Sequence, residues 1–128
     1  MTENKIIRGN VGWSKLYNPV IDDVLKYDDA QTNFNDKIGI KSIESVYGVL
    51  EIKLYHYQNA SQQLLDKIRK AEEESARTCS LCGDVNHIGI TCNDDEYCTC
   101  CEECWRKYIK PYHSHSKWKD FLTNNTYK

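Results

Sequence analysis

The chain has 128 residues, of which 40% are hydrophobic and 28% charged, a balance that excludes wholesale disorder and fits one domain with at most a small appendage. Its formal net charge of -2 excludes an overall basic field that would attract nucleic acid. The start of the chain is polar and charged, unlike a signal peptide, and no run approaches the ~18–20 apolar residues of a membrane helix. We therefore expect a cytoplasmic protein with no membrane segment.

The first predicted helix follows a loose or strand-like lead over residues 1–11. Its apolar face is formed by residues at helical spacing: Trp13, Leu16, Tyr17, Val20, Ile21, Val24 and Leu25. Pro19 interrupts this pattern, and proline suits the first helical position, with Asn18 as the N-cap. The sequence therefore predicts a helix over about 19–27, with a preceding turn that docks Trp13 as an anchor in the core.

A β-hairpin is predicted after a polar loop over 28–37. In its second strand Leu50, Ile52 and Leu54 alternate with more polar residues, which is typical of a half-buried strand. Tyr47-Gly48 supplies the tight turn. The earlier strand, about 39–46, alternates less cleanly, so a β-bulge is expected there.

A long amphipathic helix is predicted over about 60–77. Asn59 and Gln62 resemble a capping box at its start. Its apolar stripe consists of Leu64, Leu65, Ile68 and Ala71. The charged residues on its other face are expected to be a solvated surface with ion pairs between neighbouring turns.

The seven cysteines all lie between positions 79 and 104, and their number is odd, which favours metal binding over a disulfide framework in a reducing compartment. Cys79 and Cys82 are separated by two residues, as are Cys101 and Cys104, and eighteen residues lie between the pairs. Gly83 suits the turn after the first pair. This spacing is typical of a zinc ribbon or a treble clef, so we predict a structural Zn²⁺ held by these four thiolates.

Three further cysteines leave alternatives open. Cys98 and Cys101 also have two residues between them, so Cys92, Cys98 or Cys100 can replace a predicted ligand. Alternatively, one of these cysteines can bind a second metal together with His87. The simpler interpretation is small buried or free thiols. Two further histidines, His113 and His115, are expected to be exposed.

Charge is divided sharply around the cysteines. Residues 79–104 hold six acids and no Lys or Arg, whereas residues 105–128 hold six bases and one acid. The acidic side chains proposed as a docking surface for a protein partner are Asp84, Asp94, Asp95 and Glu96. A short helix from about Cys104 to Lys110, ended by Pro111, begins the basic segment.

The basic segment also supports an alternative function in nucleic-acid binding. The candidate contacts are Arg106, Lys107, Lys110, Lys117 and Lys119, interleaved with aromatic residues that can stack on bases. The competing interpretation is a closing helix whose Trp105 and Tyr108 pack on the zinc site. No phosphate-binding glycine loop, nucleophile elbow or acid–base pair is recognisable, so we expect no enzyme activity.

Several short motifs occur in one order. These are Gly12-Trp13, the hairpin around Gly48, Lys70-Ala-Glu-Glu-Glu-Ser75, Cys79 with Cys82-Gly83, and Thr99-Cys-Cys101 with Cys104. This order resembles a family of small uncharacterised zinc-knuckle proteins common in bacterial and phage genomes. The resemblance favours Cys101 and Cys104 as the second ligand pair, and it implies a role in phage–host conflict. Tyr47 and Val49 depart from the family's usual Phe and Gly.

We therefore predict an α+β fold: a helix, hairpin and long helix over 1–77, a zinc-binding module over 78–110, and a polar basic tail over 111–128. The expected function is non-enzymatic protein binding, with a host nuclease or a CRISPR effector complex as the candidate partner of a phage-encoded inhibitor.

Overall fold

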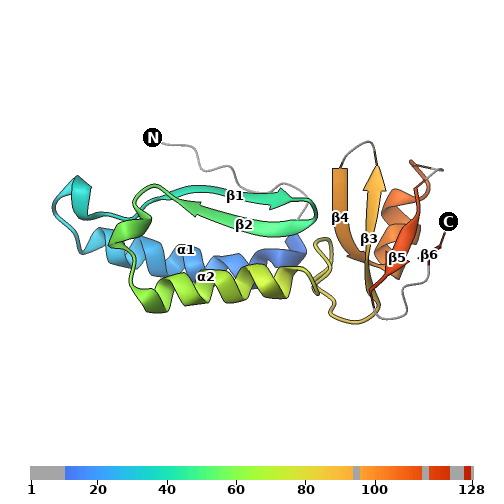
Figure 1. Ribbon diagram of the computed structural model, residues 1–128, viewed down its shortest axis with the longest axis horizontal. Coiled ribbons are helices and arrows are strands. Elements are labelled where there is room, and N and C mark those ends of the chain that lie inside the picture. The colour runs from blue at the N-terminus through green and yellow to red at the C-terminus, as the bar shows by residue number, and fades with distance from the viewer. Residues whose placement is uncertain (1–10, 94–95, 114–115, 122–125, 128) are drawn as a thin grey trace.

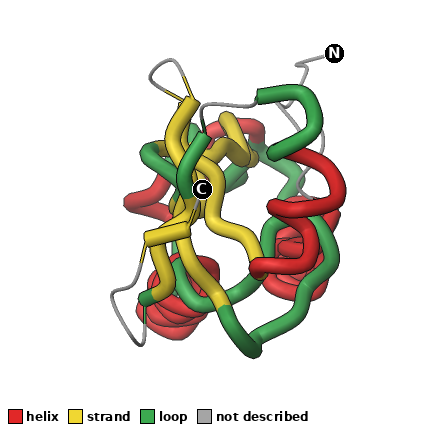
Figure 2. The backbone as a smooth tube through the Cα atoms, turned by 90° about the vertical axis from the view of Figure 1, so that its right-hand side faces the viewer, coloured by secondary structure: helices red, strands yellow, loops and turns green. Residues whose placement is uncertain are grey.

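The computed structural model describes residues 11–93, 96–113, 116–121 and 126–127. One end of the elongated molecule holds two long helices and a β-hairpin, and the other holds a four-stranded sheet with the cysteines (Figure 1). Seen from the cysteine end, the strands of this sheet lie in front of the two helices (Figure 2). The predicted α+β class is confirmed.

Helix α1 (Ser14–Asp29) begins earlier than predicted, directly after a 3-10 turn over Val11–Trp13. The prediction of a start at Pro19 with Asn18 as N-cap is wrong, because Trp13 occupies the N-cap position and Pro19 lies inside the helix. Proline removes one backbone donor from the helix. The continuous apolar face outweighs this cost, since Tyr17 and Val20 are buried on either side of the proline.

The hairpin forms as predicted from β1 (Ile40–Val46) and β2 (Val49–Leu54). Tyr47 and Gly48 have φ angles of 52° and 82°, and positive φ at both central residues is what a tight type I′ turn requires. The expected bulge is present between Ile40 and Ser42.

Helix α2 (Gln62–Ser75) covers the outer edge of β2. The amide of Leu50 donates to Ser75 Oγ, and the amide of Ile52 donates to Glu72 Oε2, each at 2.9 Å. The predicted capping box is wrong, because Ser61 caps the helix by accepting a hydrogen bond from the Leu64 amide. Asn59 instead donates its side-chain amide to two carbonyls of the loop before β1.

One apolar core lies between these two helices and the hairpin. Its buried members are Trp13, Tyr17, Val20, Val24, Ile38, Ile40, Ile43, Leu50, Ile52, Leu64, Ile68 and Ala71. Trp13 is fully buried, and its indole N–H donates to the carbonyl of Thr78 at 2.9 Å, so its predicted role as an anchor is confirmed.

The cysteine region contains an antiparallel sheet in the order β4-β3-β5-β6. Its strands are β3 (Ile88–Asn93), β4 (Glu96–Cys101), β5 (Trp118–Asp120) and β6 (Thr126–Tyr127). The predicted short helix is present as α3 (Glu102–Cys104) followed by the π-helical segment η4 (Trp105–Ile109), two residues earlier than expected.

Part of the expected polar tail belongs to the fold. Strand β5 pairs with β3, and Trp118 is fully buried, so the segment after Pro111 is not only a polar extension. The alternation of buried Trp118 and Asp120 around exposed Lys119 gives this short strand a dry face and a wet face.

The two regions contact each other through backbone groups, small residues and a ring contact between Tyr47 and Tyr97 at 5.6 Å between centroids. The Gly12 amide donates to the carbonyl of Ser80 at 2.9 Å, and the Thr99 hydroxyl donates to the carbonyl of Gly48. A Cβ on Gly12 would lie 2.2 Å from the carbonyl oxygen of Cys79, so only glycine permits this approach. Within the described part of the chain, no helix has the length and apolarity needed to cross a bilayer.

Candidate metal centre

The first cysteine pair lies in a tight turn after α2. The Cys82 amide points at the Cys79 sulfur at 3.4 Å, and the Gly83 amide donates to the Cys79 carbonyl at 2.9 Å. Gly83 has a φ of 83°, which confirms that the turn uses a left-handed glycine. This geometry directs both sulfurs of the pair toward one point.

The second pair lies where β4 passes into α3. Cys101 is the N-cap residue of that helix, and its sulfur accepts a hydrogen bond from the Cys104 amide at 3.5 Å. The two pairs are thus built alike, each with an amide of the second cysteine pointing at the sulfur of the first.

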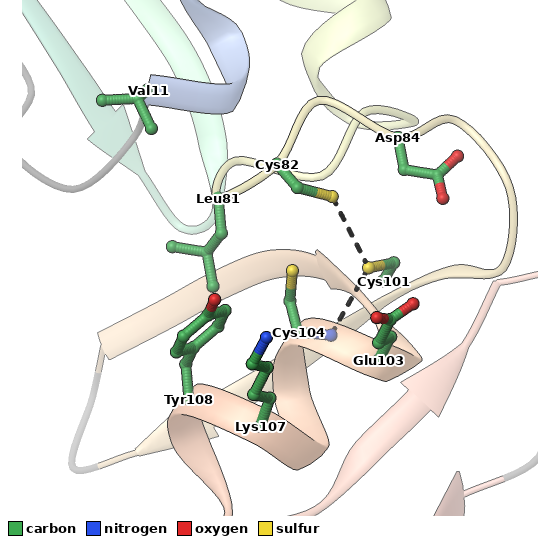
Figure 3. Close-up of a pocket in the computed structure, with 9 residues that line it drawn as sticks. All are labelled: Val11, Leu81, Cys82, Asp84, Cys101, Glu103, Cys104, Lys107 and Tyr108. Carbon is green, nitrogen blue, oxygen red and sulfur yellow. Dashed lines mark hydrogen bonds between the residues drawn. The ribbon is translucent and has the colours of Figure 1, made fainter.

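The two pairs converge on one point. Figure 3 shows three of the four cysteines, Cys82, Cys101 and Cys104, with their side chains turned toward one another. The four Sγ atoms of Cys79, Cys82, Cys101 and Cys104 lie within 4.8 Å of one another, and those of Cys82 and Cys101 are 3.8 Å apart. Four sulfurs at ~2.3 Å from a common ion form a tetrahedron with edges of ~3.8 Å. The predicted cysteines therefore lie close enough together to hold a metal ion.

The connection between the pairs distinguishes the two predicted zinc folds. The first turn is followed by the hairpin β3-β4, and the second pair opens a helix. This order of turn, hairpin and helix is that of a treble clef, whereas a zinc ribbon takes both pairs from hairpin turns.

Burial and hydrogen bonding shift the acidity of these thiols in opposite directions. Burial raises the pKa of Cys79, but hydrogen bonds from the backbone of Cys101, Cys82 and Leu81 outweigh it and leave the pKa below its ordinary value. Burial raises the pKa of Cys101 to about 11. The pKa of Cys104 is also raised, by burial and by its hydrogen bond to Cys101. A metal that binds these thiols must therefore displace protons from at least some of them.

The remaining cysteines lie outside this group. Cys98 contacts the hydroxyl of Ser80 at 3.5 Å, and a hydrogen bond with Cys100 lowers its pKa to about 7 against the effect of burial. Cys100 is fully buried, and Cys92 is exposed on β3. In the described residues none of the three belongs to a group of metal-ligating side chains, so the alternatives that gave them a ligand role are not supported.

The histidines do not supply ligands either in the part of the chain that is described. The backbone of His87 forms a hydrogen bond, in which its carbonyl accepts from the Glu102 amide at 3.2 Å. His113 is exposed, as expected, and His115 lies outside the described residues.

Two tryptophans pack behind the sulfurs. The rings of Trp105 and Trp118 stack at 6.4 Å between centroids, and both side chains are fully buried beside Cys100 and Cys101. Their indole N–H groups donate to Ser116 Oγ and to the Cys100 carbonyl. The prediction that Trp105 packs against the zinc site is supported, and neither ring is free to stack on a base. Tyr108, which was expected to pack there too, is half exposed and lines a cavity beside the sulfurs.

The basic residues proposed for nucleic-acid binding have mixed surroundings. Arg106 forms an ion pair with Glu102 at 2.7 Å, and both Arg106 and Lys110 lie over the Trp105 ring. Lys107 lies over the Tyr108 ring. Lys117 and Lys119 are exposed on either side of buried Trp118.

The predicted acidic docking surface is only partly described. Asp84 is exposed in the loop after the first pair, where its carboxylate accepts a hydrogen bond from the Asn86 amide at 3.0 Å. Asp94 and Asp95 lie outside the described residues, and Glu96 begins β4 with only its backbone described. This surface therefore stays a prediction.

A cavity of about 380 Å³ opens beside the cluster (Figure 3). It is lined by three of the four cysteines and by Val11, Leu81, Asp84, Glu103, Lys107 and Tyr108. Sequence reasoning missed this cavity and the buried role of Trp118. The alternation of Ile88, Ile90 and Cys92 with other residues is typical of a strand and could have predicted β3.

Comparisons with protein-family models, with curated proteins and with solved structures found no match to this chain.

Proposed function

We propose that the four-cysteine cluster holds one structural Zn²⁺ that stabilises the treble-clef-like region. The observation that supports this most strongly is the convergence of four sulfurs from two turns of the same construction within 4.8 Å. An all-sulfur tetrahedral site suits zinc, which has no geometric preference of its own, or an iron centre. Zinc needs no redox partner and fits a site in which all four positions are taken by protein.

The need for a metal follows from the composition of this region. Its buried cluster consists of Ile88, two tryptophans and four cysteines, of which three are proposed ligands. Thiols without a metal pack as small hydrophobic groups, each burying less apolar surface than a Leu, Ile or Phe side chain. Binding of zinc to such modules supplies on the order of 10 kcal/mol of apparent folding free energy.

Metal analysis of the purified protein tests this part of the proposal. We expect one equivalent of zinc per chain, retained in Cys92→Ser and lost in Cys101→Ser. The first substitution is a matched control, because it changes a cysteine of the same segment outside the cluster. Less than ~0.5 equivalent of any metal, with Cys101→Ser still folded, would contradict it.

We further propose that the protein acts by binding another protein and not by catalysis. A closed set of four thiolates leaves no position for a reacting water. Large apolar side chains are exposed at the end of the molecule away from the cysteines, including Leu25, Phe34, Tyr55 and Tyr57. Exposed apolar groups of this size are typical of interaction surfaces.

The class of partner is proposed from the sequence resemblance alone. The proposed partner is a host nuclease or a CRISPR effector complex, and this chain would be its phage-encoded inhibitor. Affinity purification from a bacterial host tests this, with Leu25→Asp/Phe34→Asp and Asp84→Lys as separate variants. A partner that either variant loses, and that Cys92→Ser keeps, supports protein binding. Failure of the wild-type chain to retain any partner contradicts it.

Nucleic-acid binding is the weaker proposal. The two tryptophans that would stack on bases are buried and hydrogen-bonded, and Arg106 is ion-paired. Binding that falls steeply with salt and is lost on replacement of Lys107, Lys117 and Lys119 would favour it.

A further inference from the structure

The four cysteines of the cluster differ in their exposure to solvent. Cys79, Cys101 and Cys104 are 0%, 4% and 6% exposed, whereas Cys82 is exposed. Figure 3 shows the Cys82 sulfur at the first turn, facing Cys101 across the cluster. Cys82 is therefore the most solvent-exposed residue of the four.

Hydrogen bonding divides the four sulfurs into two with a backbone donor and two without one. The Cys82 amide points at the Cys79 sulfur, and the Cys104 amide points at the Cys101 sulfur. Among the described residues, no backbone amide points at the sulfur of Cys82 or of Cys104, and only Cys82 of these two is exposed. Because an amide donor withdraws electron density from a thiolate, sulfurs without one are the better nucleophiles in a metal–thiolate site. Of the two such sulfurs here, one belongs to the exposed Cys82 and the other to the buried Cys104.

The cavity beside the cluster selects the kind of reagent. Its charged lining is Asp84, Glu103 and Lys107, which sums to one negative charge. Four thiolates around a divalent ion add a formal charge near −2. A small neutral molecule can enter about 380 Å³ of such space, while an anion is repelled.

We propose that Cys82 is a modification site at which a neutral hydroperoxide oxidises the cluster and releases its metal. This inference rests on the proposed zinc centre. It assigns the exposed position of Cys82 a chemical consequence: the ion is stably held under reducing conditions and is lost when peroxide reaches this one sulfur.

The reaction balances without a further co-reactant. The Cys82 thiolate attacks one oxygen of hydrogen peroxide, the O–O bond breaks, and the products are a Cys82 sulfenic acid and hydroxide. The Cys101 thiolate, 3.8 Å away, then attacks the Cys82 sulfur, so that an S–S bond forms and a second hydroxide leaves. Two thiolates lose two electrons and the peroxide gains them. Only two of the four sulfurs then remain for the metal.

The test uses the full chain carrying Cys92→Ser and Cys98→Ser, which removes the more accessible thiols outside the cluster. Metal content is measured first. If the chain holds no zinc, the proposed zinc centre is rejected, and the relative reactivity of the four thiols is then tested only by labelling of the wild-type chain, described below. A zinc-loaded chain is treated with substoichiometric hydrogen peroxide, while a chromogenic chelator follows zinc release. Samples are quenched with N-ethylmaleimide and digested with a protease that cuts before aspartate.

This digestion separates the groups that matter. Cuts before Asp66, Asp84, Asp94, Asp95 and Asp120 place the first cysteine pair on one peptide and the second pair on another. We expect a cross-linked product between these peptides, located by fragmentation at Cys82 and Cys101, that forms at the rate of zinc release. A first disulfide within either pair, or zinc release that precedes any change at Cys82, overturns the proposal.

A second measurement avoids dependence on the double variant. In the wild-type chain, brief labelling with N-ethylmaleimide should modify Cys82 at least ~5-fold faster than each of the other three ligands. Cys92 is followed separately, since cuts before Asp84 and Asp94 isolate it. Equal labelling of the four ligands overturns the ranking whether or not metal is bound.

A charged reagent tests the role of the cavity. The neutral disulfide 4,4′-dithiodipyridine should react with Cys82 about 10-fold faster than the dianionic Ellman reagent at low ionic strength, and salt should narrow this difference. Equal rates for the two disulfides at low salt contradict the selection of neutral reagents.

Discussion

The two ends of the molecule reach order by different physical means. The helical end buries twelve apolar side chains between two helices and a hairpin. The apolar cluster of the cysteine end has seven buried members, of which four are cysteines. Burial of apolar surface contributes about 25 cal/mol per Å², so the first end can form a core from its own side chains, whereas we propose that the second is stabilised by a metal. Their contacts run through Gly12, Trp13 and Gly48, close to both cores.

Removal of the metal should have the largest effect and should separate the two ends. With a strong chelator, or in Cys101→Ser, we expect loss of amide-exchange protection in β3, β4 and the following helix, while α1 and α2 keep theirs. The apparent loss is on the order of 10 kcal/mol for the cysteine end. Hydrogen exchange with mass spectrometry checks this by segment. Uniform protection throughout the chelated chain would contradict the comparison, and Cys92→Ser serves as the control.

Substitution of Trp13 should weaken the helical end most. Trp13→Ala removes a fully buried ring and its hydrogen bond to the Thr78 carbonyl, and we expect a loss of ~3–5 kcal/mol in urea unfolding. Trp13→Phe keeps most of the apolar contact and should cost less. A loss confined to the cysteine end would show that the indole serves the contact between the ends more than the core.

Substitution of Gly12 tests the contact itself. The Cβ of Gly12→Ala would lie 2.2 Å from the Cys79 carbonyl oxygen and 2.5 Å from the Gly83 amide nitrogen, so backbone must move. We expect a loss of ~1–3 kcal/mol, with weaker zinc retention against a competing chelator. Val11→Ala is the control, since Val11 is 65% exposed. Unchanged zinc retention in Gly12→Ala would mean that the two ends are energetically independent.

The smallest expected effect concerns Glu72, which caps the edge of β2. Burial raises the pKa of its carboxyl, the hydrogen bond from the Ile52 amide opposes this, and the nearby Glu51 adds to the rise. The folded state binds the Glu72 proton more tightly than the unfolded state does. The contribution of this proton to the free energy of unfolding is therefore present at low pH and is lost as pH rises through the raised pKa.

Glu72→Gln removes that pH dependence and keeps an oxygen to accept from Ile52. In urea unfolding at pH 7.5, we expect the variant to have a slightly larger free energy of unfolding than the wild type. This difference should shrink on acidification toward pH 4. The difference between the two chains is compared at each pH, so protonation of the cysteine cluster cancels. A gain that grows on acidification would contradict the sign of the shift.

Local patterns predicted the elements whose residues carry their own signal. The hairpin was predictable because Leu50, Ile52 and Leu54 alternate around a turn that needs positive φ. The ligand set was predictable because a two-residue spacing directs both sulfurs of a pair to one side of a turn. Predictions failed where distant contacts decided the outcome. Pro19 lies inside α1 because the apolar face of this helix is buried both before and after the proline.

The sequence by itself determined the α+β class, the hairpin and the four candidate ligands, since each depends on residues near one another in the chain. Only the tertiary structure decided that the last segment adds a strand with Trp118 behind the sulfurs, that Gly12 contacts the Cys79 turn, and that Cys82 is the exposed one of the four candidate ligands. These features depend on which surfaces meet after folding, and burial is a property of the assembled chain that no local spacing encodes.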